Sequence, residues 1–257
     1  MIISDELFES FLKCKTKCYL LNKGFENLPN EYCEWQNILI KDYKKKCLLK
    51  LIKNFKRNEY ILGSIILKEF KNKSIRLAIE PSIQTSDIKS FPHAIECLLV
   101  SKQKEFIPIR FSLNEKILKD EKLLITFDSI AMSLVTRYTP PFGKIIHGEK
   151  FVTLKVQTKV YFDSVNEILK KIRCLIENSS PPDLILKKHC SECLFEKECF
   201  EMAKEKDDLT LLSRMSKKEQ KKLHNKGLFT ITQLSYTFRP RKPNKRAKKK
   251  LLNMTML

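Results

Sequence analysis

Glycine is scarce in this sequence, with 5 residues in 257, and tryptophan occurs only once. Because lysine, glutamate and leucine are common instead, the composition favours helices over a loop-rich β architecture. No apolar run is long enough to span a bilayer. The first ten residues, MIISDELFES, contain an early acidic pair and lack the apolar stretch of a signal peptide. We therefore expect a cytoplasmic protein whose thiols stay reduced.

Acidic residues are also in short supply. Asp and Glu number 30 against 50 Lys and Arg, which gives a formal net charge of +20. A surplus of this size attracts polyanions, and nucleic acid is the first partner to expect. The alternative is that lysine simply covers every surface. Hydrophobic residues make up 42% of the chain, so the sequence can form a core large enough for one domain with a small appendage.

The periodicity of the apolar residues indicates a mixed α/β body. Helical spacing runs through residues 1–21, 31–56, 119–136 and 165–176. Short β-branched runs predict strands at residues 60–62, 64–67, 74–79, 94–100 and 106–111, and a hairpin at 145–148 and 151–156. Two short helices are expected between residues 207 and 235, with Asn225-Lys226-Gly227 as the turn.

Three of the nine cysteines are close together: Cys190 and Cys193 form a CxxC pair, and Cys199 follows. In a reducing compartment such spacing indicates metal ligation rather than disulfides. A [4Fe–4S] cluster or tetrahedral zinc needs a fourth ligand. Cys14 or Cys18 can supply it if the N-terminal helix lies beside this loop.

The spacing alone leaves iron–sulfur and zinc both open. A zinc ribbon normally has two CxxC pairs, and the N-terminal pair here is CxxxC, which favours the iron–sulfur cluster. His189 adjoins the cysteines and is interpreted as a neighbour. The other cysteines stand singly in apolar patterns and are expected to be ordinary buried residues: Cys33, Cys47, Cys97 and Cys174.

These features resemble the iron–sulfur nucleases of the RecB type, which include CRISPR-associated exonucleases. The matching motifs lie in residues 182–186, 189–195, 206–216 and 226–242, and the resemblance extends over essentially the whole chain. It implies a restriction-endonuclease-like core over residues 1–205, closed by a [4Fe–4S] cluster on Cys14, Cys190, Cys193 and Cys199. A helix–hairpin–helix-like element (206–238) and a basic tail or linker (239–257) follow. Longer members continue into an RNase H-like exonuclease domain, so a separately encoded domain of that kind is an expected partner.

The resemblance also implies a metal site made of an Asp, a Glu-x-Lys on the next strand and a Gln-x-x-x-Tyr helix. His93 stands at the expected Asp position, the strand 106–111 has no Glu-x-Lys, and leucine and phenylalanine replace Gln and Tyr in the helix. Glu80, Asp87 and Glu96, with Arg110 or Lys104 as the cation, are the candidates for a divergent Mg²⁺ or Mn²⁺ site. The alternative is that these carboxylates are surface or turn residues.

Nucleic acid has two candidate contacts. Backbone N–H groups near Lys226, Gly227 and Thr230 can bind a phosphate if the hairpin acts as a helix–hairpin–helix; otherwise it is a plain cap. The tail has eight basic residues among positions 239–250, including Arg239, Arg241, Lys242, Lys245 and Arg246.

Three functions remain open. The chain is a metal-dependent DNA nuclease with a divergent site, a catalytically silent nucleic-acid-binding domain that positions a separate exonuclease, or a zinc-stabilised scaffold.

Overall fold

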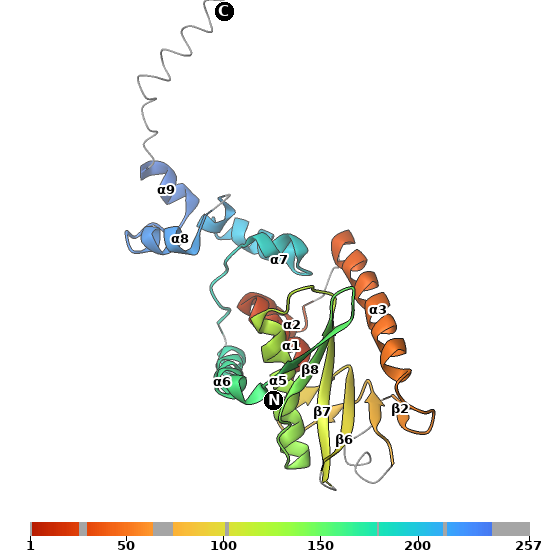
Figure 1. Ribbon diagram of the computed structural model, residues 1–257. Coiled ribbons are helices and arrows are strands. Elements are labelled where there is room, and N and C mark those ends of the chain that lie inside the picture. The colour runs from red at the N-terminus through yellow and green to blue at the C-terminus, as the bar shows by residue number, and fades with distance from the viewer. Residues whose placement is uncertain are drawn as a thin grey trace, which may run out of the picture. The chain divides into compact units, whose positions relative to one another are not determined.

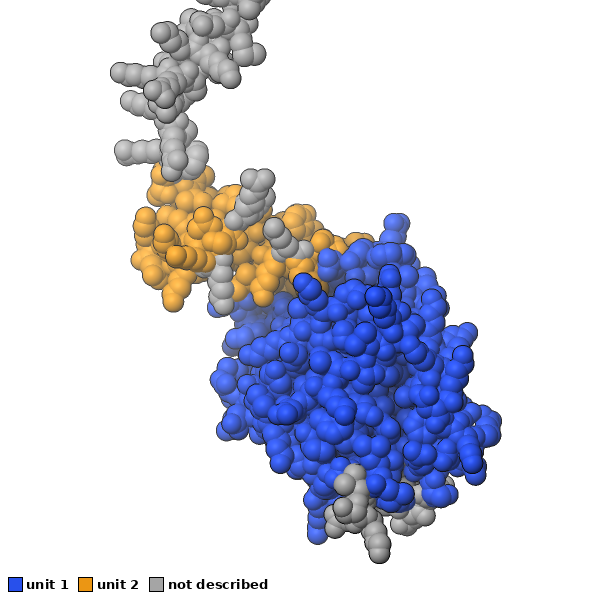
Figure 2. Space-filling model, viewed as in Figure 1, with its two compact units in different colours: residues 1–183, 192–195 blue, residues 184–191, 196–257 orange. Residues whose placement is uncertain are grey.

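A computed structural model describes residues 2–25, 30–63, 74–100, 103–178, 180–212 and 215–237. The chain divides into two compact units, which Figure 2 shows in different colours. The first comprises residues 1–183 and 192–195, and the second residues 184–191 and 196–257. The second unit therefore begins near residue 184, whereas the sequence placed the first boundary at 205.

The first unit is a mixed α/β body, as expected, and its main sheet has the strand order β2-β3-β6-β7-β8-β9 (Figure 1). The strands are β2 (Tyr60–Leu62), β3 (Leu77–Ile79), β6 (Ala94–Val100), β7 (Gln103–Ser112), β8 (Gly143–His147) and β9 (Val152–Val156). β6 and β7 are antiparallel, and β7 and β8 are parallel because α5 (Lys119–Thr136) connects them. The predicted helix over 119–136 and the hairpin after it are confirmed. The strand expected at 64–67 lies outside the described residues.

A second, small sheet pairs β1 (Ile3–Ser4) in parallel with β5 (Ile88–Ser90), and β5 with β4 (Ile83–Gln84). The expected single N-terminal helix is two helices, α1 (Asp5–Lys13) and α2 (Lys15–Asn22). They are separated by Cys14, whose backbone is extended at φ −161°. Ser4 caps α1 by accepting a hydrogen bond from the Leu7 N–H, as the sequence indicates.

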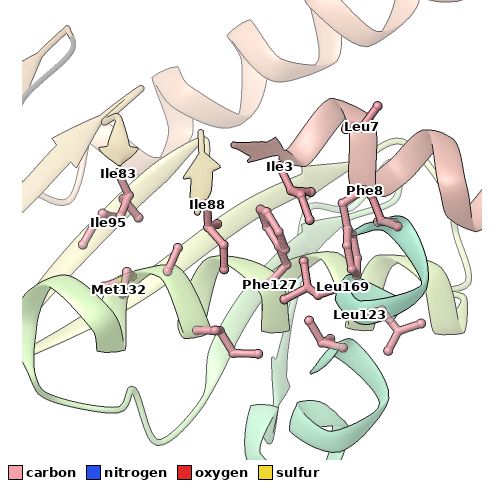
Figure 3. Packing of buried hydrophobic residues seen from close by; sticks show 14 of the residues in the cluster. Ile3, Leu7, Phe8, Ile83, Ile88, Ile95, Leu123, Phe127, Met132 and Leu169 are labelled. Carbon is pink, nitrogen blue, oxygen red and sulfur yellow. The ribbon is translucent and has the colours of Figure 1, made fainter. Parts of the chain in front are cut away.

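Apolar side chains cover both faces of the main sheet. One face packs on α1, α5 and α6 (Phe162–Glu177). Phe8 of α1 stacks on Phe127 of α5 at 4.7 Å between ring centroids, in the middle of this core (Figure 3). On the other face, α3 (Glu31–Ile52) inserts Tyr43 and Cys47 against strand residues that include Ile109.

The second unit is helical. It contains η2 (Lys188–Glu192, whose last residue belongs to the first unit), α7 (Glu196–Glu205), η3 (Leu209–Leu211), α8 (Lys217–His224) and α9 (Ile231–Thr237). The two short helices expected between 207 and 235 are thus present. In the described part of the chain, no helix has both the length and the apolarity needed to cross a membrane.

Candidate functional site: a buried ion-pair network and the cysteine segment

The main polar feature of the first unit is a network of four side chains with Arg110 at its centre. Its Nε donates to Asp128 Oδ2 at 2.5 Å and its Nη2 donates to Asp128 Oδ1 at 2.7 Å. Nη2 also donates to Asp5 Oδ2 at 2.9 Å, and the Ser90 hydroxyl donates to Asp128 Oδ1 at 2.6 Å. Asp5, Ser90, Arg110 and Asp128 are called the ion-pair network below. A fork of two N–H donors on one carboxylate is among the strongest polar contacts in proteins.

Local sequence places each member of the network. Arg110 follows Ile109 on β7, so its side chain points to the sheet face opposite Ile109, toward α5. Asp128 lies in the middle of α5, where the side chain is completely buried. Asp5 begins α1 directly after β1, which pairs with the strand that ends in Ser90. Helices α5 and α1 thus each deliver a carboxylate to one buried guanidinium, and β5 supplies the hydroxyl that donates to Asp128.

Electrostatics keep this guanidinium charged. Burial alone would lower the pKa of Arg110, but the Asp128 and Asp5 carboxylates outweigh burial and raise it. A buried charge without a partner costs several kcal/mol, so this network requires each of its charged members.

More titratable groups adjoin the network. Burial, together with Arg110 and Lys44, lowers the pKa of His93 well below 6.5. The neutral ring fits its contact, because Nδ1 of His93 accepts the Phe111 N–H at 2.7 Å. Burial, followed by Arg110, also lowers the pKa of Lys44, against the opposing effect of Glu9.

The structure does not bring the proposed divergent metal site together. Glu96 pairs with Ile107 across the sheet and shares the face of Ile107, so it points away from the face on which Arg110 lies. Its carboxylate forms an ion pair with Lys144 instead. Glu80 is exposed, has a left-handed φ of 51°, and acts electrostatically on Lys44. The polar residues that do meet, Asp5 and Asp128, were missed, although a lone carboxylate in the apolar run of residues 123–134 signals a buried partner.

The cysteines fall in both units: Cys14 and Cys193 in the first, and Cys190 and Cys199 in the second. Cys193 and Cys199 are buried. The Sγ of Cys190 accepts the Lys187 N–H at 3.1 Å. Within the described ranges, no three His, Cys, Asp or Glu side chains lie close enough to hold a metal ion.

Cys33, which the sequence predicts to be an ordinary buried residue, lies next to Glu192. Its Sγ donates to the Glu192 carbonyl at 3.3 Å, one residue before Cys193, and both belong to the first unit. Cys14 is half-buried and extended, and Cys18 is completely buried within the apolar core, where burial, followed by Cys14, raises its pKa to about 12. Sequence spacing gave no sign that Cys33 lies here, because 159 residues separate it from Glu192.

The helical hairpin of the second unit satisfies its own backbone. The left-handed Gly227, at φ 76°, closes α8, and its N–H donates to the His224 carbonyl. At the start of α9, the Gln233 side chain accepts the Phe229 N–H, Thr230 Oγ1 accepts the Gln233 N–H, and Asp207 accepts the N–H groups of Ile231 and Thr232. These N–H groups are therefore already bonded, which favours the plain cap over phosphate binding. Lys226 is exposed, whereas the tail residues Arg239, Arg241, Lys242, Lys245 and Arg246 lie outside the described residues.

Comparisons with known proteins add little. No protein-family model and no curated protein matches the chain. Among solved structures, it is similar to the one described as "Crystal structure of SSO0001", with 13% identity over 63% of this chain and 95% of that chain. The TM-score of this match is 0.31, and at that value the likeness carries no argument.

Proposed function

We propose that this chain is a RecB-like domain that binds nucleic acid and is catalytically silent, with a [4Fe–4S] cluster as a structural clamp. The observation that supports the absence of catalysis is the ion-pair network. Metal-dependent hydrolysis needs at least two convergent carboxylates that are free to take Mg²⁺ or Mn²⁺. Here both oxygens of Asp128 accept from Arg110, and Asp5 accepts from the same guanidinium.

The position of Arg110 strengthens the proposal. By the resemblance, the catalytic Asp falls at His93, and the Glu-x-Lys belongs to the strand that pairs with the following residues. In this chain, Pro108 and Ile109 of that strand pair with Ile95 and Ala94, and Arg110 follows them, so it falls where the family has the Lys of Glu-x-Lys. A fixed guanidinium thus occupies the carboxylates Asp5 and Asp128. Arg110 cannot lose its proton or exchange with solvent metal.

The binding half rests on charge. The net charge of +20 and the eight basic residues among positions 239–250 supply positive charge that attracts phosphates without base readout. The role that we assign to such a silent domain is to position a separate RNase H-like exonuclease on the strand.

For the clamp, the hydrogen bond from Cys33 to the Glu192 carbonyl, inside the first unit, supports Cys33 as the fourth ligand. The other three ligands, Cys190, Cys193 and Cys199, are those that the resemblance implies. The donor chemistry fits, since four cysteine thiolates are the usual ligand set of a [4Fe–4S] cluster. When bound, the cluster would cross-link the segments that carry its ligands and so stabilise the fold, and we assign it no step in a reaction.

Activity is tested with the full chain, purified anaerobically, labelled single-stranded DNA and Mn²⁺. We expect binding that weakens steeply with salt and no cleavage. Cleavage that disappears in Glu80→Ala or Glu96→Ala would overturn the silent assignment in favour of the divergent nuclease.

The clamp is tested separately by the iron, sulfide and zinc content of Cys33→Ala, Cys14→Ala and Cys174→Ala, where the exposed Cys174 is the control. We expect loss of iron and of the visible absorption band in Cys33→Ala alone. Loss in Cys14→Ala instead restores the ligand set expected from the sequence, and a colourless wild-type protein that carries zinc rules out the iron–sulfur assignment.

A further inference from the structure

Helix α3 has an apolar stripe on the side that faces away from its own core. Its buried side is formed by Cys33, Tyr43 and Cys47. On the opposite side, Trp35, Ile38 and Leu49 are 55%, 59% and 57% exposed. Single exposed apolar residues are common on protein surfaces, but three large ones in a line along one side of a helix form a contiguous patch, which indicates an interaction site.

The spacing of this outer line is that of a coiled-coil seam. Successive members follow at steps of four and three residues, which keeps them on one side over the whole helix. The outer stripe, as we define it, consists of Glu31, Trp35, Ile38, Asp42, Lys45 and Leu49. A helix of 22 residues is about 33 Å long, enough for several layers of contact with a second helix.

The stripe is complementary to itself when it is reversed. We propose that α3 pairs antiparallel with α3 of a second copy of this chain, around a two-fold axis between Asp42 and Lys45. The axis sets Asp42 of each copy opposite Lys45 of the other, and Ile38 opposite Leu49. Trp35 then meets the half-buried Ile52 at each end. The result is two central ion pairs flanked by two apolar layers on each side, an isologous interface of the kind that closes a dimer.

The same residues fit other occupants less well. Trp35 and the lysines of α3 would favour nucleic acid, but the exposed Ile38 and Leu49 would gain nothing from contact with phosphates. Glu31, one helical turn before Trp35, and Glu34, directly before it, would repel the phosphates. A second copy supplies an apolar partner for each apolar residue and an opposite charge for each central charge.

The test uses charge exchange. The mass of the full chain is measured by sedimentation velocity over a concentration series, without nucleic acid. Asp42→Lys and Lys45→Asp each create two like-charge contacts across the axis, so each should weaken dimerisation at least about tenfold. The double variant D42K/K45D restores both ion pairs in reversed order and should return the dissociation constant to within about threefold of wild type.

Apolar variants provide the second arm. Ile38→Glu and Leu49→Glu should yield monomers, whereas Leu134→Glu, at a site on α5 that is 58% exposed, should leave the dimer intact. Circular dichroism of each variant checks that the fold is retained. A wild-type chain that stays monomeric at all concentrations overturns the proposal, as does a double variant no better than the singles. Loss of DNA binding in Trp35→Ala by a monomeric protein assigns the stripe to nucleic acid instead.

Discussion

Asp128→Asn is the substitution that most directly tests the ion-pair network. The change keeps the size of the side chain and an acceptor for Ser90, but removes the charge that faces Arg110. Removing one partner from a buried ion pair typically costs about 3–5 kcal/mol. Because Asp5 still accepts from Arg110 at 2.9 Å, the lower end applies, about 3 kcal/mol. For a folded unit of this size, that loss lowers Tm by roughly 6–12 °C.

The assay is thermal unfolding followed by circular dichroism, together with Arg110→Met and the double variant R110M/D128N. The single variants each leave a buried charge without its main partner, whereas the double variant removes both charges. The double variant should therefore be at least about 2 kcal/mol more stable than the sum of the single losses predicts. Asp87→Asn is the control: Asp87 is 58% exposed and lies 3.6 Å from Arg173, so its loss should move Tm by less than about 2 °C. The network is refuted if Asp128→Asn unfolds at the same temperature as wild type. It is also refuted if the stability lost in R110M/D128N equals the sum of the losses in the two single variants.

Two further predictions concern titration and salt. His93 has a folded-state pKa well below 6.5. As the pH falls below about 6.5, its side chain therefore binds a proton in the unfolded chain but stays neutral in the folded chain. Stability should fall as the pH drops below about 6.5, by up to about 1.4 kcal/mol per pH unit, and the difference in Tm between wild type and His93→Gln measures this slope. Truncation after residue 238 should lower DNA affinity and flatten its dependence on salt, as measured by fluorescence anisotropy from 50 to 300 mM salt; an unchanged slope would place the phosphate contacts elsewhere.

Regular secondary structure was predictable where the pattern was long. The 18-residue helix α5 begins and ends where its apolar spacing does, and the hairpin of β8 and β9 follows its alternation. The break at Cys14 was not predictable, because the apolar spacing continues through it without proline or glycine. β1 and β4 have two residues each, too few for a period to be visible.

The candidate site was harder to predict because it depends on pairing between distant residues. Arg110 was singled out as a cation, but its partners are 18 and 105 residues away along the chain. The carboxylates considered for a divergent metal site, Glu80 and Glu96, were chosen by sequence position. A strand reverses its side-chain direction at every residue, so a match in sequence position says nothing until the register is known. Here the register sends Glu96 to Lys144 and Arg110 to Asp128.

The charges around Arg110 also bear on where nucleic acid can bind. Asp5, Glu9, Glu80 and Asp128 adjoin the cations Lys13, Lys17, Lys44 and Arg110, and His93 is neutral. Four carboxylates against four cations leave no positive excess to attract a phosphate. Arg110→Met would free two carboxylates for a metal while making the net charge of this region negative. We therefore expect Arg110→Met to remain inactive with Mn²⁺ and to bind DNA as wild type does, because our proposal assigns DNA binding to basic residues elsewhere. Cleavage by this variant would show that the guanidinium alone silences the site.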